Sequence, residues 1–304
     1  MKREKRSGGK RGPGPTTAAV QAGRRPQIPN AKSQIPNPKA FTLIELLVVI
    51  AVIALLMAIL LPVLAKVRKQ AKALACQSNL RQWAITLHTY TAENDGKLPC
   101  SSREGLSGWL GAWRPLLRYE QDRNKIFLCP MTTMPPEDAV SEGGTFKAFR
   151  VSPGPFAGPP TRELMCGSYG WSNYVTIPSG STDNRSVYWD SLNVKRPASI
   201  PFFFDCTQPW FGPIGEAMGS PPRCEDREPL SGRSAAEATS RVCMNRHTGG
   251  INMTFLDGSV RKVGLKELWT LKWHRQYDTA NAWTKAGGVQ PEDWPEWMRK
   301  FKDY

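Results

Sequence analysis

FTLIELLVVIAVIALLMAILL, residues 41–61, is the stretch that decides how the rest of this chain is organised. It contains one charged side chain, Glu45, and is apolar on every side. A helix that crosses a membrane needs about 20 such residues, whereas the apolar part of a cleaved secretory signal is usually about 7–15 residues long. Because no polar residues mark a surface face, a core helix of a soluble domain is disfavoured. The stretch therefore predicts one membrane-spanning helix over residues 41–61.

The segment before this stretch is basic and poor in apolar side chains. Residues 1–40 hold ten Lys and Arg and one acid, so they carry +9 of the formal net charge of +15, and the other 264 of the 304 residues carry +6. Such a composition cannot bury enough apolar surface to fold, and a disordered leader is expected. A tail that binds nucleic acid is the alternative. The segment lacks the interleaved aromatics or recognition helix of such a binder, so no nucleic-acid partner is expected.

Glu45 is the residue of the apolar stretch that needs an explanation. A carboxylate in hydrocarbon costs about 2.5–3.5 kcal/mol at a helix centre and less near an end. No flanking basic residue lies nearby on the same helix face. If the chain were cut just before Phe41, the new α-ammonium group would lie about one helical turn from Glu45. That amine, on the same chain or on a packed neighbour, is the expected counter-ion.

Residues 40–45, Ala-Phe-Thr-Leu-Ile-Glu, followed by the apolar stretch, resemble the cleavage and methylation motif of type IV prepilins and type II secretion pseudopilins. The resemblance implies that a prepilin peptidase cuts between Ala40 and Phe41 and then methylates the new amine of Phe41. It also implies that Glu45 neutralises the N-terminus of a neighbouring subunit during assembly. The family more often has Gly where this chain has Ala40. The implied partners are the peptidase, further copies of the chain and other pseudopilins.

The resemblance also implies a location, which charge counting alone does not decide. Within twenty residues of the apolar stretch, four basic residues precede it and five follow it, and so small a difference sets no orientation. The mean hydropathy of −0.42 excludes a protein with many membrane spans. The expected arrangement is a single pass through the inner (cytoplasmic) membrane, with the C-terminal domain in the periplasm.

Apolar residues continue at helical spacing beyond residue 61, with basic residues between them. Pro62 is expected to kink this helix rather than end it, and Asn94-Asp95-Gly96 is the expected stop. As one helix, residues 41–93 would be about 80 Å long. The part over 62–94 is amphipathic and needs a soluble body to cover its apolar face. Its apolar positions are Val63, Val67, Leu74, Leu80, Trp83, Leu87 and Tyr90.

Residues 95–304 are expected to form that body, with an α+β fold in which a small antiparallel sheet packs on the long helix in a pilin-like arrangement. The clearest element is a hairpin of strands over 251–256 and 259–263, because Asp-Gly between alternating runs is the strongest short-range hairpin signal. Five Trp near the C-terminus are expected in the core. The other expected elements are strands over 168–177, 187–189 and 200–205, helices over 106–119 and 265–273, and long loops over 130–165 and 207–240.

The cysteine positions suggest disulfides more than a metal site. The chain has seven cysteines, with no C-x-x-C and no spacing typical of zinc. In an oxidising compartment they could form up to three disulfides with one thiol left over. Cys224 and Cys243 bracket a polar stretch and are the expected pair, and free buried thiols are the alternative.

One constellation suggests chemistry: His247 to Asn252, followed by Asp257-Gly258. Nine residues separate His247 from Asp257, and the region resembles the H-X9-DG region at the C-terminus of many prepilin-like proteins. In a functional interpretation these side chains bind a metal, such as calcium near Asp257, or act as acid and base. In the structural interpretation, which we favour, His247 and Asn252 bind backbone groups and Asp257-Gly258 forms a turn. One His and one Asp make neither a nucleophile nor a complete metal shell, so no metal is expected.

No other motif points to catalysis. The chain has three His and lacks H-E-x-x-H, a P-loop, G-x-S-x-G and a dinucleotide fingerprint. We therefore expect no enzyme and no cofactor. The resemblance to prepilins and pseudopilins implies a structural subunit of a type II secretion or type IV pilus-type filament. The alternative is a membrane-anchored envelope binding protein or enzyme that uses the region of His247 and Asp257.

Overall fold

A computed structural model describes residues 41–100, 116, 126–136, 143–151, 165–178, 185–213, 215, 218–225 and 238–304. The expected leader, including Ala40, lies outside the described residues. So does the helix expected over 106–119, apart from Leu116. Parts of the two long loops expected over 130–165 and 207–240 also lie outside them.

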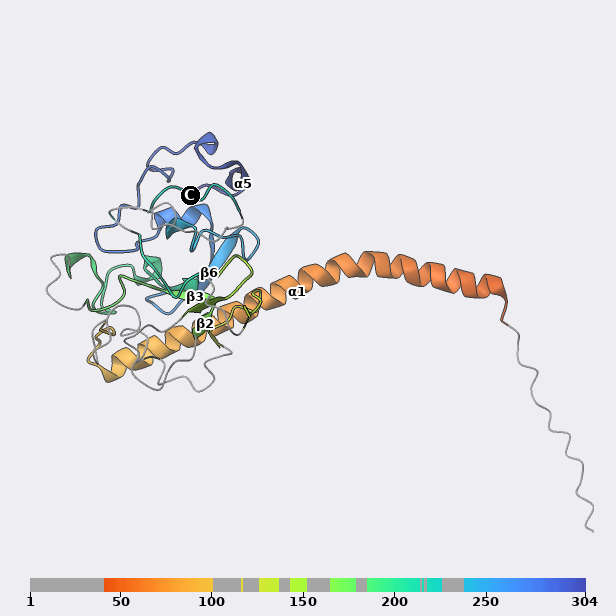
Figure 1. Cartoon of the computed structure of the whole chain (residues 1–304), viewed down its shortest axis with the longest axis horizontal. Helices are drawn as coiled ribbons and strands as arrows, with labels where there is room; N and C mark the ends of the chain where they lie inside the picture. Colours follow the sequence, from red (N-terminus) through yellow and green to blue (C-terminus); the bar gives the residue numbers. More distant parts are fainter. Residues whose placement is uncertain are drawn as a thin grey trace, which may run out of the picture. The chain divides into compact units, whose positions relative to one another are not determined.

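Helix α1 runs from Leu43 to Glu93, a length of 51 residues, and it continues through Pro62 (Figure 1). It ends where the sequence predicts. Asp95 and Gly96 both adopt positive φ angles, of 56° and 73°, and the N–H of Gly96 donates to the carbonyl of Thr91 at 2.8 Å. This left-handed exit satisfies a carbonyl of the last turn, as is common at helix C-termini.

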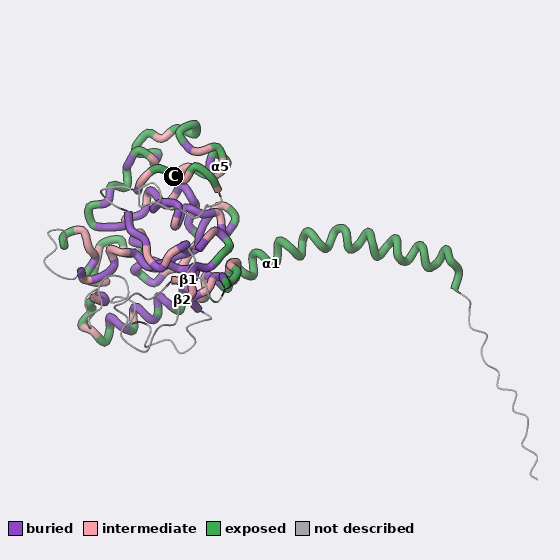
Figure 2. Tube along the Cα trace, viewed as in Figure 1, coloured by how far each residue is buried: buried purple, intermediate pink, exposed green. Residues whose placement is uncertain are grey.

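The environment of α1 changes along its length (Figure 2). Residues 41–72 are all exposed, and α1 is long and apolar enough to cross a membrane. Buried positions begin at Cys76 and recur on one face, at Cys76, Leu80, Trp83, Ala84, Thr86, Leu87, Tyr90 and Thr91. Three of the positions predicted for this face, Val63, Val67 and Leu74, are instead exposed. The covered face therefore begins later than the sequence pattern predicts.

The body contains a five-stranded sheet in the order β5-β3-β4-β6-β7. Neighbouring strands are antiparallel except β3 and β5, which pair parallel, so the sheet is mixed and not purely antiparallel as expected. A separate antiparallel pair is formed by β1 and β2. The strands are β1 (Phe149–Val151), β2 (Met165–Gly167), β3 (Tyr169–Ser172), β4 (Pro201–Asp205), β5 (Trp210–Phe211), β6 (Gly250–Phe255) and β7 (Val260–Gly264).

The sheet is covered on both faces, and the alternation of side chains along its central strands shows how. Phe203 of β4 packs with Trp83 of α1, with ring centroids 5.0 Å apart. The next residue, Phe204, points to the opposite face and packs against Trp273 at 5.3 Å. This period of two is what a pleated strand imposes. One face therefore packs on the second half of α1 and the other on the C-terminal segment, which gives the expected α+β arrangement.

The C-terminal segment is rich in buried tryptophan. Trp269, Trp273 and Trp294 are at most 1 % exposed, while Trp283 and Trp297 are partly buried against the same core. This confirms the prediction that these aromatics belong to the core. The short helices of this part are η4 (Lys266–Thr270), η5 (Pro291–Asp293) and α5 (Glu296–Arg299).

Two local predictions are wrong. Residues 187–189 do not form a strand: Arg185–Val187 is the 3-10 helix η2, and Trp189 makes an isolated pairing with Val175. The helix expected over 265–273 is the short 3-10 helix η4. The remaining 3-10 helix is η3 (Pro197–Ser199). The hairpin is confirmed, with Gly250 opposite Gly264 and Thr254 opposite Val260.

Candidate functional site

The first candidate site is the start of α1, where Thr42 and Glu45 cap the helix reciprocally. Glu45 Oε2 accepts hydrogen bonds from the backbone N–H of Thr42 at 2.9 Å and from its hydroxyl at 2.8 Å. In return, the N–H of Glu45 donates to Thr42 Oγ1 at 3.2 Å. This is a capping box, which satisfies donors that the first turn of a helix leaves free. The cap holds the carboxylate one turn from Phe41, the residue that the sequence predicts as the mature N-terminus.

The second candidate site is the H-X9-DG region, and the structure divides it. His247 precedes β6 and Asp257 follows it, so six strand residues separate the two ends. Asp257 Oδ1 accepts from the N–H and hydroxyl of Ser259, at 2.8 and 2.6 Å, and its side chain is exposed. Gly258 has a φ of 79°, which a side chain would strain. Asp257 and Gly258 therefore form the turn that the structural interpretation predicts, away from His247.

Asn252 lies in the middle of β6 on the face that packs against α1. Its side-chain N–H donates to the carbonyl of Ala73 at 3.2 Å, and its side-chain oxygen accepts from Gln77 at 3.0 Å. Two strand positions further on, the hydroxyl of Thr254 donates to the carbonyl of Leu80 at 3.1 Å. The polar residues of β6 thus bind α1, which agrees with a structural role for Asn252.

His247 is buried, and its Nε2 atom contacts two acidic groups. It lies 3.0 Å from Asp205 Oδ2 and 3.4 Å from Cys129 Sγ. Its other ring nitrogen, Nδ1, is buried and has no hydrogen-bond partner among the described residues. Burial disfavours the charged ring, but the carboxylate of Asp205 outweighs it and raises the pKa of His247 to about 9. This environment differs from the structural interpretation, in which the side chain binds backbone groups.

Asp205 ends β4 and is fully buried. Its Oδ1 atom accepts from Arg246 Nη1 at 2.9 Å, and its Oδ2 atom accepts from the N–H of Asn252 at 2.8 Å. Burial alone would raise the pKa of this carboxyl, but the charges of His247 and Arg246 hold it below its usual value. Arg246 also donates to the carbonyls of Gly144, Thr145 and Ser168. The guanidinium of the ion pair is therefore held in place by three backbone carbonyls.

Two cysteines complete this region. Cys76 of α1 has its Sγ atom 3.8 Å from both carboxylate oxygens of Asp205 and accepts a hydrogen bond from Tyr169 at 3.3 Å. Burial raises the pKa of the Cys76 thiol. Burial also opposes ionisation of Cys129, but hydrogen bonds from Cys76 and His247 outweigh it and lower its pKa. We use the name "buried cluster" for Cys76, Cys129, Asp205 and His247.

The geometry of the buried cluster is not that of a catalytic triad. In a triad, nucleophile and acid bind opposite nitrogens of the imidazole. Here Cys129 and Asp205 both contact Nε2 of His247. The functional atoms of the four residues all lie within 4.8 Å of one another. Because the thiol and the carboxylate share one ring nitrogen, the imidazole cannot pass a proton from Cys129 to Asp205 through its two nitrogens.

The sequence did not indicate the buried cluster, because its members are far apart in the chain. Cys76 and His247 are separated by most of the body, and neither cysteine belongs to a recognisable ligand motif. Two weak signals are present in retrospect. Asp205 ends the apolar strand Phe202-Phe203-Phe204, and Arg246-His247 places two basic side chains side by side. A buried acid needs such partners.

The structure shows no disulfide between Cys224 and Cys243, the expected pair. Cys243 is buried in the C-terminal core, with its Sγ atom 3.9 Å from Met298 Sδ, whereas Cys224 is exposed. The apolar surroundings of Cys243 raise the pKa of its thiol. Core packing thus separates the environments of the two thiols.

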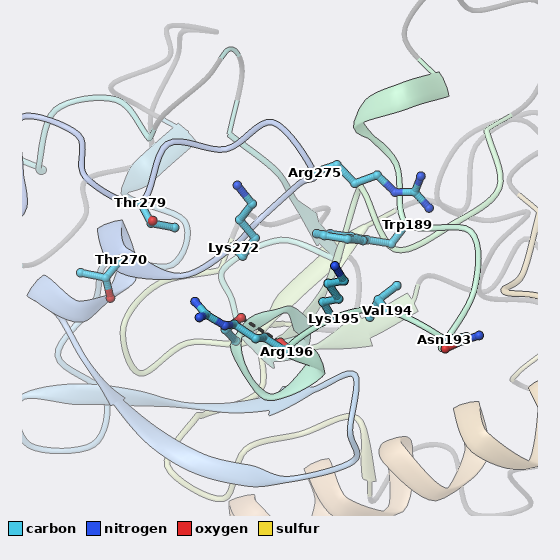
Figure 3. A pocket seen from close by; sticks show the side chains of 10 residues that line it. Trp189, Asn193, Val194, Lys195, Arg196, Thr270, Lys272, Arg275 and Thr279 are labelled. Carbon is cyan, nitrogen blue, oxygen red and sulfur yellow. Dashed lines mark hydrogen bonds between the residues drawn. The ribbon is translucent and has the colours of Figure 1, made fainter.

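A surface pocket of about 630 Å³ lies between the loop after Trp189 and the segment after η4 (Figure 3). Its lining contains four basic side chains, Lys195, Arg196, Lys272 and Arg275. The guanidinium of Arg275 lies 5.6 Å from the centre of the Trp189 ring and pairs with Asp190 at 2.7 Å. The pocket is therefore positively charged and partly aromatic, and none of its lining residues belongs to the buried cluster.

Comparison with known proteins adds one finding. Residues 35–61 match a family model described as the prokaryotic N-terminal methylation motif. No curated protein and no solved structure matches the chain. The motif, together with the long apolar helix that follows it, is consistent with a type IV prepilin-like protein and with a single-pass membrane anchor.

Proposed function

We propose that this chain is the precursor of a pseudopilin-like subunit in a type II secretion or type IV pilus-type filament. The observation that carries the proposal is the coincidence of the methylation motif at residues 35–61 with a capped helix whose first 30 residues are exposed. In the proposal, a prepilin peptidase cuts between Ala40 and Phe41 and methylates Phe41. The apolar half of α1 then anchors the subunit in the inner membrane, with residues 95–304 in the periplasm.

The capping box gives Glu45 two tasks, one local and one between subunits. The local task is to cap its own helix through Thr42. A carboxylate with a single residue as partner keeps lone pairs free for a further donor. The α-ammonium group of a neighbouring Phe41 would supply that donor, and it would offset the cost of placing the carboxylate in hydrocarbon. Assembly then pairs the carboxylate of Glu45 with the α-ammonium group of a neighbouring Phe41, and each of these charges is unfavourable in hydrocarbon without the other.

The N-terminus of the membrane form tests the processing step. Mass spectrometry of the protein isolated from host membranes is expected to find a chain that begins with N-methyl-Phe41. A chain that begins at Met1 or Lys2 would contradict the proposal. A chain that begins at an unmethylated Phe41 would support cleavage by the peptidase and contradict the proposed methylation.

Glu45→Gln tests the assembly step, because Gln preserves a capping box while removing the charge. Charge-assisted hydrogen bonds contribute about 1.5–3 kcal/mol, so cross-linked oligomers in the membrane are expected to fall by roughly 10–100-fold. Glu93→Gln, at the other end of the same helix, is the matched control and should leave the oligomers unchanged. Oligomers of Glu45→Gln at the wild-type level would mean that the charge has no part in assembly.

A further inference from the structure

The buried cluster plays no part in the proposed function, yet it gathers the four residues from separate parts of the chain. Cys76 comes from α1, Cys129 from the segment 126–136, Asp205 from the end of β4 and His247 from the turn before β6. All four are at most 4 % exposed. Burial of so many ionisable groups in one place costs free energy unless each is paired. The cluster therefore requires an explanation beyond packing.

The distances within the cluster are within a few tenths of an ångström to about 1 Å of those around a tetrahedral zinc ion. Zinc binds sulfur at about 2.3 Å, imidazole nitrogen at about 2.0–2.1 Å and carboxylate oxygen at about 2.0–2.2 Å, which places neighbouring ligand atoms roughly 3.3–3.8 Å apart. Here Cys129 Sγ lies 3.4 Å from His247 Nε2. Asp205 Oδ2 lies 3.0 Å from the same nitrogen and 3.8 Å from Cys76 Sγ. The four donor atoms all lie within 4.8 Å of one another.

The contacts of His247 Nε2 favour a cation over a hydrogen bond. A ring N–H donates one well-aligned hydrogen bond, but this nitrogen faces both a carboxylate oxygen and a sulfur atom. A metal ion bound to the nitrogen lone pair satisfies all these acceptors at once. Two thiolates, an imidazole and a carboxylate form a donor set that suits zinc, whereas calcium and magnesium require oxygen ligands.

The groups around the cluster are those that hold metal ligands in place. Arg246 and the N–H of Asn252 hold Asp205, and the hydroxyl of Tyr169 donates to Cys76 Sγ. Such outer contacts orient ligands and are a regular part of metal sites. The charges also balance, because one Zn²⁺ and the Arg246 guanidinium offset two thiolates and one carboxylate. A neutral total is what a site without solvent contact requires.

We propose that the buried cluster binds one zinc ion as a closed, structural site. All four positions of the tetrahedron would be taken by protein ligands, which is typical of structural rather than catalytic zinc. Binding releases three protons, one from each thiol and one from His247 Nε2, as Zn²⁺ takes their place. The ion would tie α1, through Cys76, directly to β4 and to the start of β6. The inference does not depend on assembly into a filament.

The metal content of the full-length chain tests this proposal. The protein is purified in detergent from membranes under reducing conditions without chelators. Its zinc content is measured by inductively coupled plasma mass spectrometry. About one zinc per chain is expected. In Cys129→Ser the zinc is expected to fall below about a tenth of that value. Cys243→Ser, which removes a buried thiol outside the cluster, is the matched control and should retain one zinc per chain.

A second measurement on the unaltered protein covers the case in which Cys129→Ser fails to fold. After exchange with Co²⁺, thiolate ligands should produce charge-transfer absorption in the near ultraviolet and strong visible bands of tetrahedral cobalt. A zinc-free protein that is lighter by two hydrogens would overturn the proposal, and peptide mapping would show whether the disulfide joins Cys76 to Cys129. Zinc-free protein with reactive thiols would also overturn it, as would zinc retained in full by folded Cys129→Ser.

Discussion

The two halves of α1 are continuous in sequence and in hydrogen bonding, but their surroundings differ completely. In the first half every residue up to position 72 is exposed, and large apolar side chains such as Leu55 and Ile59 are more than half exposed. In the second half, Leu80, Trp83 and Leu87 are at most 1 % exposed, while Leu74 and Ile85 on the other side are open. One half is apolar all round, and the other is apolar on a stripe.

The width of the apolar surface on each half of α1 indicates what kind of partner can bury it. A stripe is the amount of surface that one sheet can bury, and β4 and β6 bury it in this chain. An apolar surface on all sides cannot be covered by a single body. For the first half, the proposed function supplies the cover as membrane lipid and neighbouring helices.

Three predictions test how firmly the second half is held by the body, from the largest expected effect to the smallest.

Arg246→Met should produce the largest loss, because the buried carboxylate of Asp205 loses its guanidinium partner and keeps only His247 as a charged neighbour. Removal of one partner of a buried ion pair typically costs about 3–5 kcal/mol in the free energy of unfolding. The carbonyls of Gly144, Thr145 and Ser168 also lose their donor. Urea unfolding of the full chain in detergent, followed by tryptophan fluorescence, measures the change.

Arg275→Met is the matched control for that substitution. Its ion pair with Asp190 is on the surface, with side chains 41 % and 60 % exposed. Exposed pairs contribute about 0–1 kcal/mol. Equal losses for Arg246→Met and Arg275→Met would show that the buried pair does not hold the body together.

Leu87→Ala tests the stripe itself. Leu87 is 1 % exposed, and large-to-small substitution of a buried leucine costs about 2–5 kcal/mol through lost burial and a new cavity. Leu55→Ala, in the first half, changes a side chain that is 64 % exposed. Because this side chain is not buried, the free energy of unfolding of the chain should change by less than about 0.5 kcal/mol. A large loss for Leu55→Ala would mean that the two halves do not behave independently.

Gly258→Ala tests the hairpin turn that packs beside α1. The φ of Gly258 is 79°, and a Cβ atom there would lie 3.2 Å from His88 Nε2 of the helix. A left-handed conformation costs a residue with a side chain about 1–2 kcal/mol, so a loss of this size is expected in urea unfolding. Gly144→Ala is the control, because its Cβ would make only an ordinary contact, 3.7 Å from Lys147 Cβ. A neutral Gly258→Ala would show that the turn rearranges without cost.

Several features of the fold were predictable because their signals are local. The apolar stretch, the end of α1 at Asp95-Gly96 and the hairpin at Asp257-Gly258 all depend on residues within a few positions of one another. The strand over 187–189 and the burial of Val63 and Val67 were predicted from similar patterns and are wrong. In those cases the tertiary contacts available at the position, and not the local pattern, decide the outcome.

The candidate sites divide in the same way. Phe41 and Glu45 were identified from the resemblance of residues 40–45 to the prepilin motif, and helical spacing places them about one turn apart. His247 was identified, but with Asp257 as its partner, and the structure gives it Asp205 and Cys129 instead. His247 and Asp257 lie at opposite ends of β6, so they are far apart. Asp205 ends the neighbouring strand β4 and therefore lies beside His247. Spacing along the chain contains no information about that second kind of proximity.

The sequence by itself therefore determined that the chain has one apolar helix with an acid in its first turn, followed by an α+β body that covers part of its continuation. Periodicity and turn chemistry are sufficient for that, since they act between near neighbours. Only the tertiary structure decided the order of strands, the parallel pairing of β5 and the meeting of Cys76 with Cys129, Asp205 and His247. These depend on which surfaces pack together, and packing brings together residues that are distant in the chain.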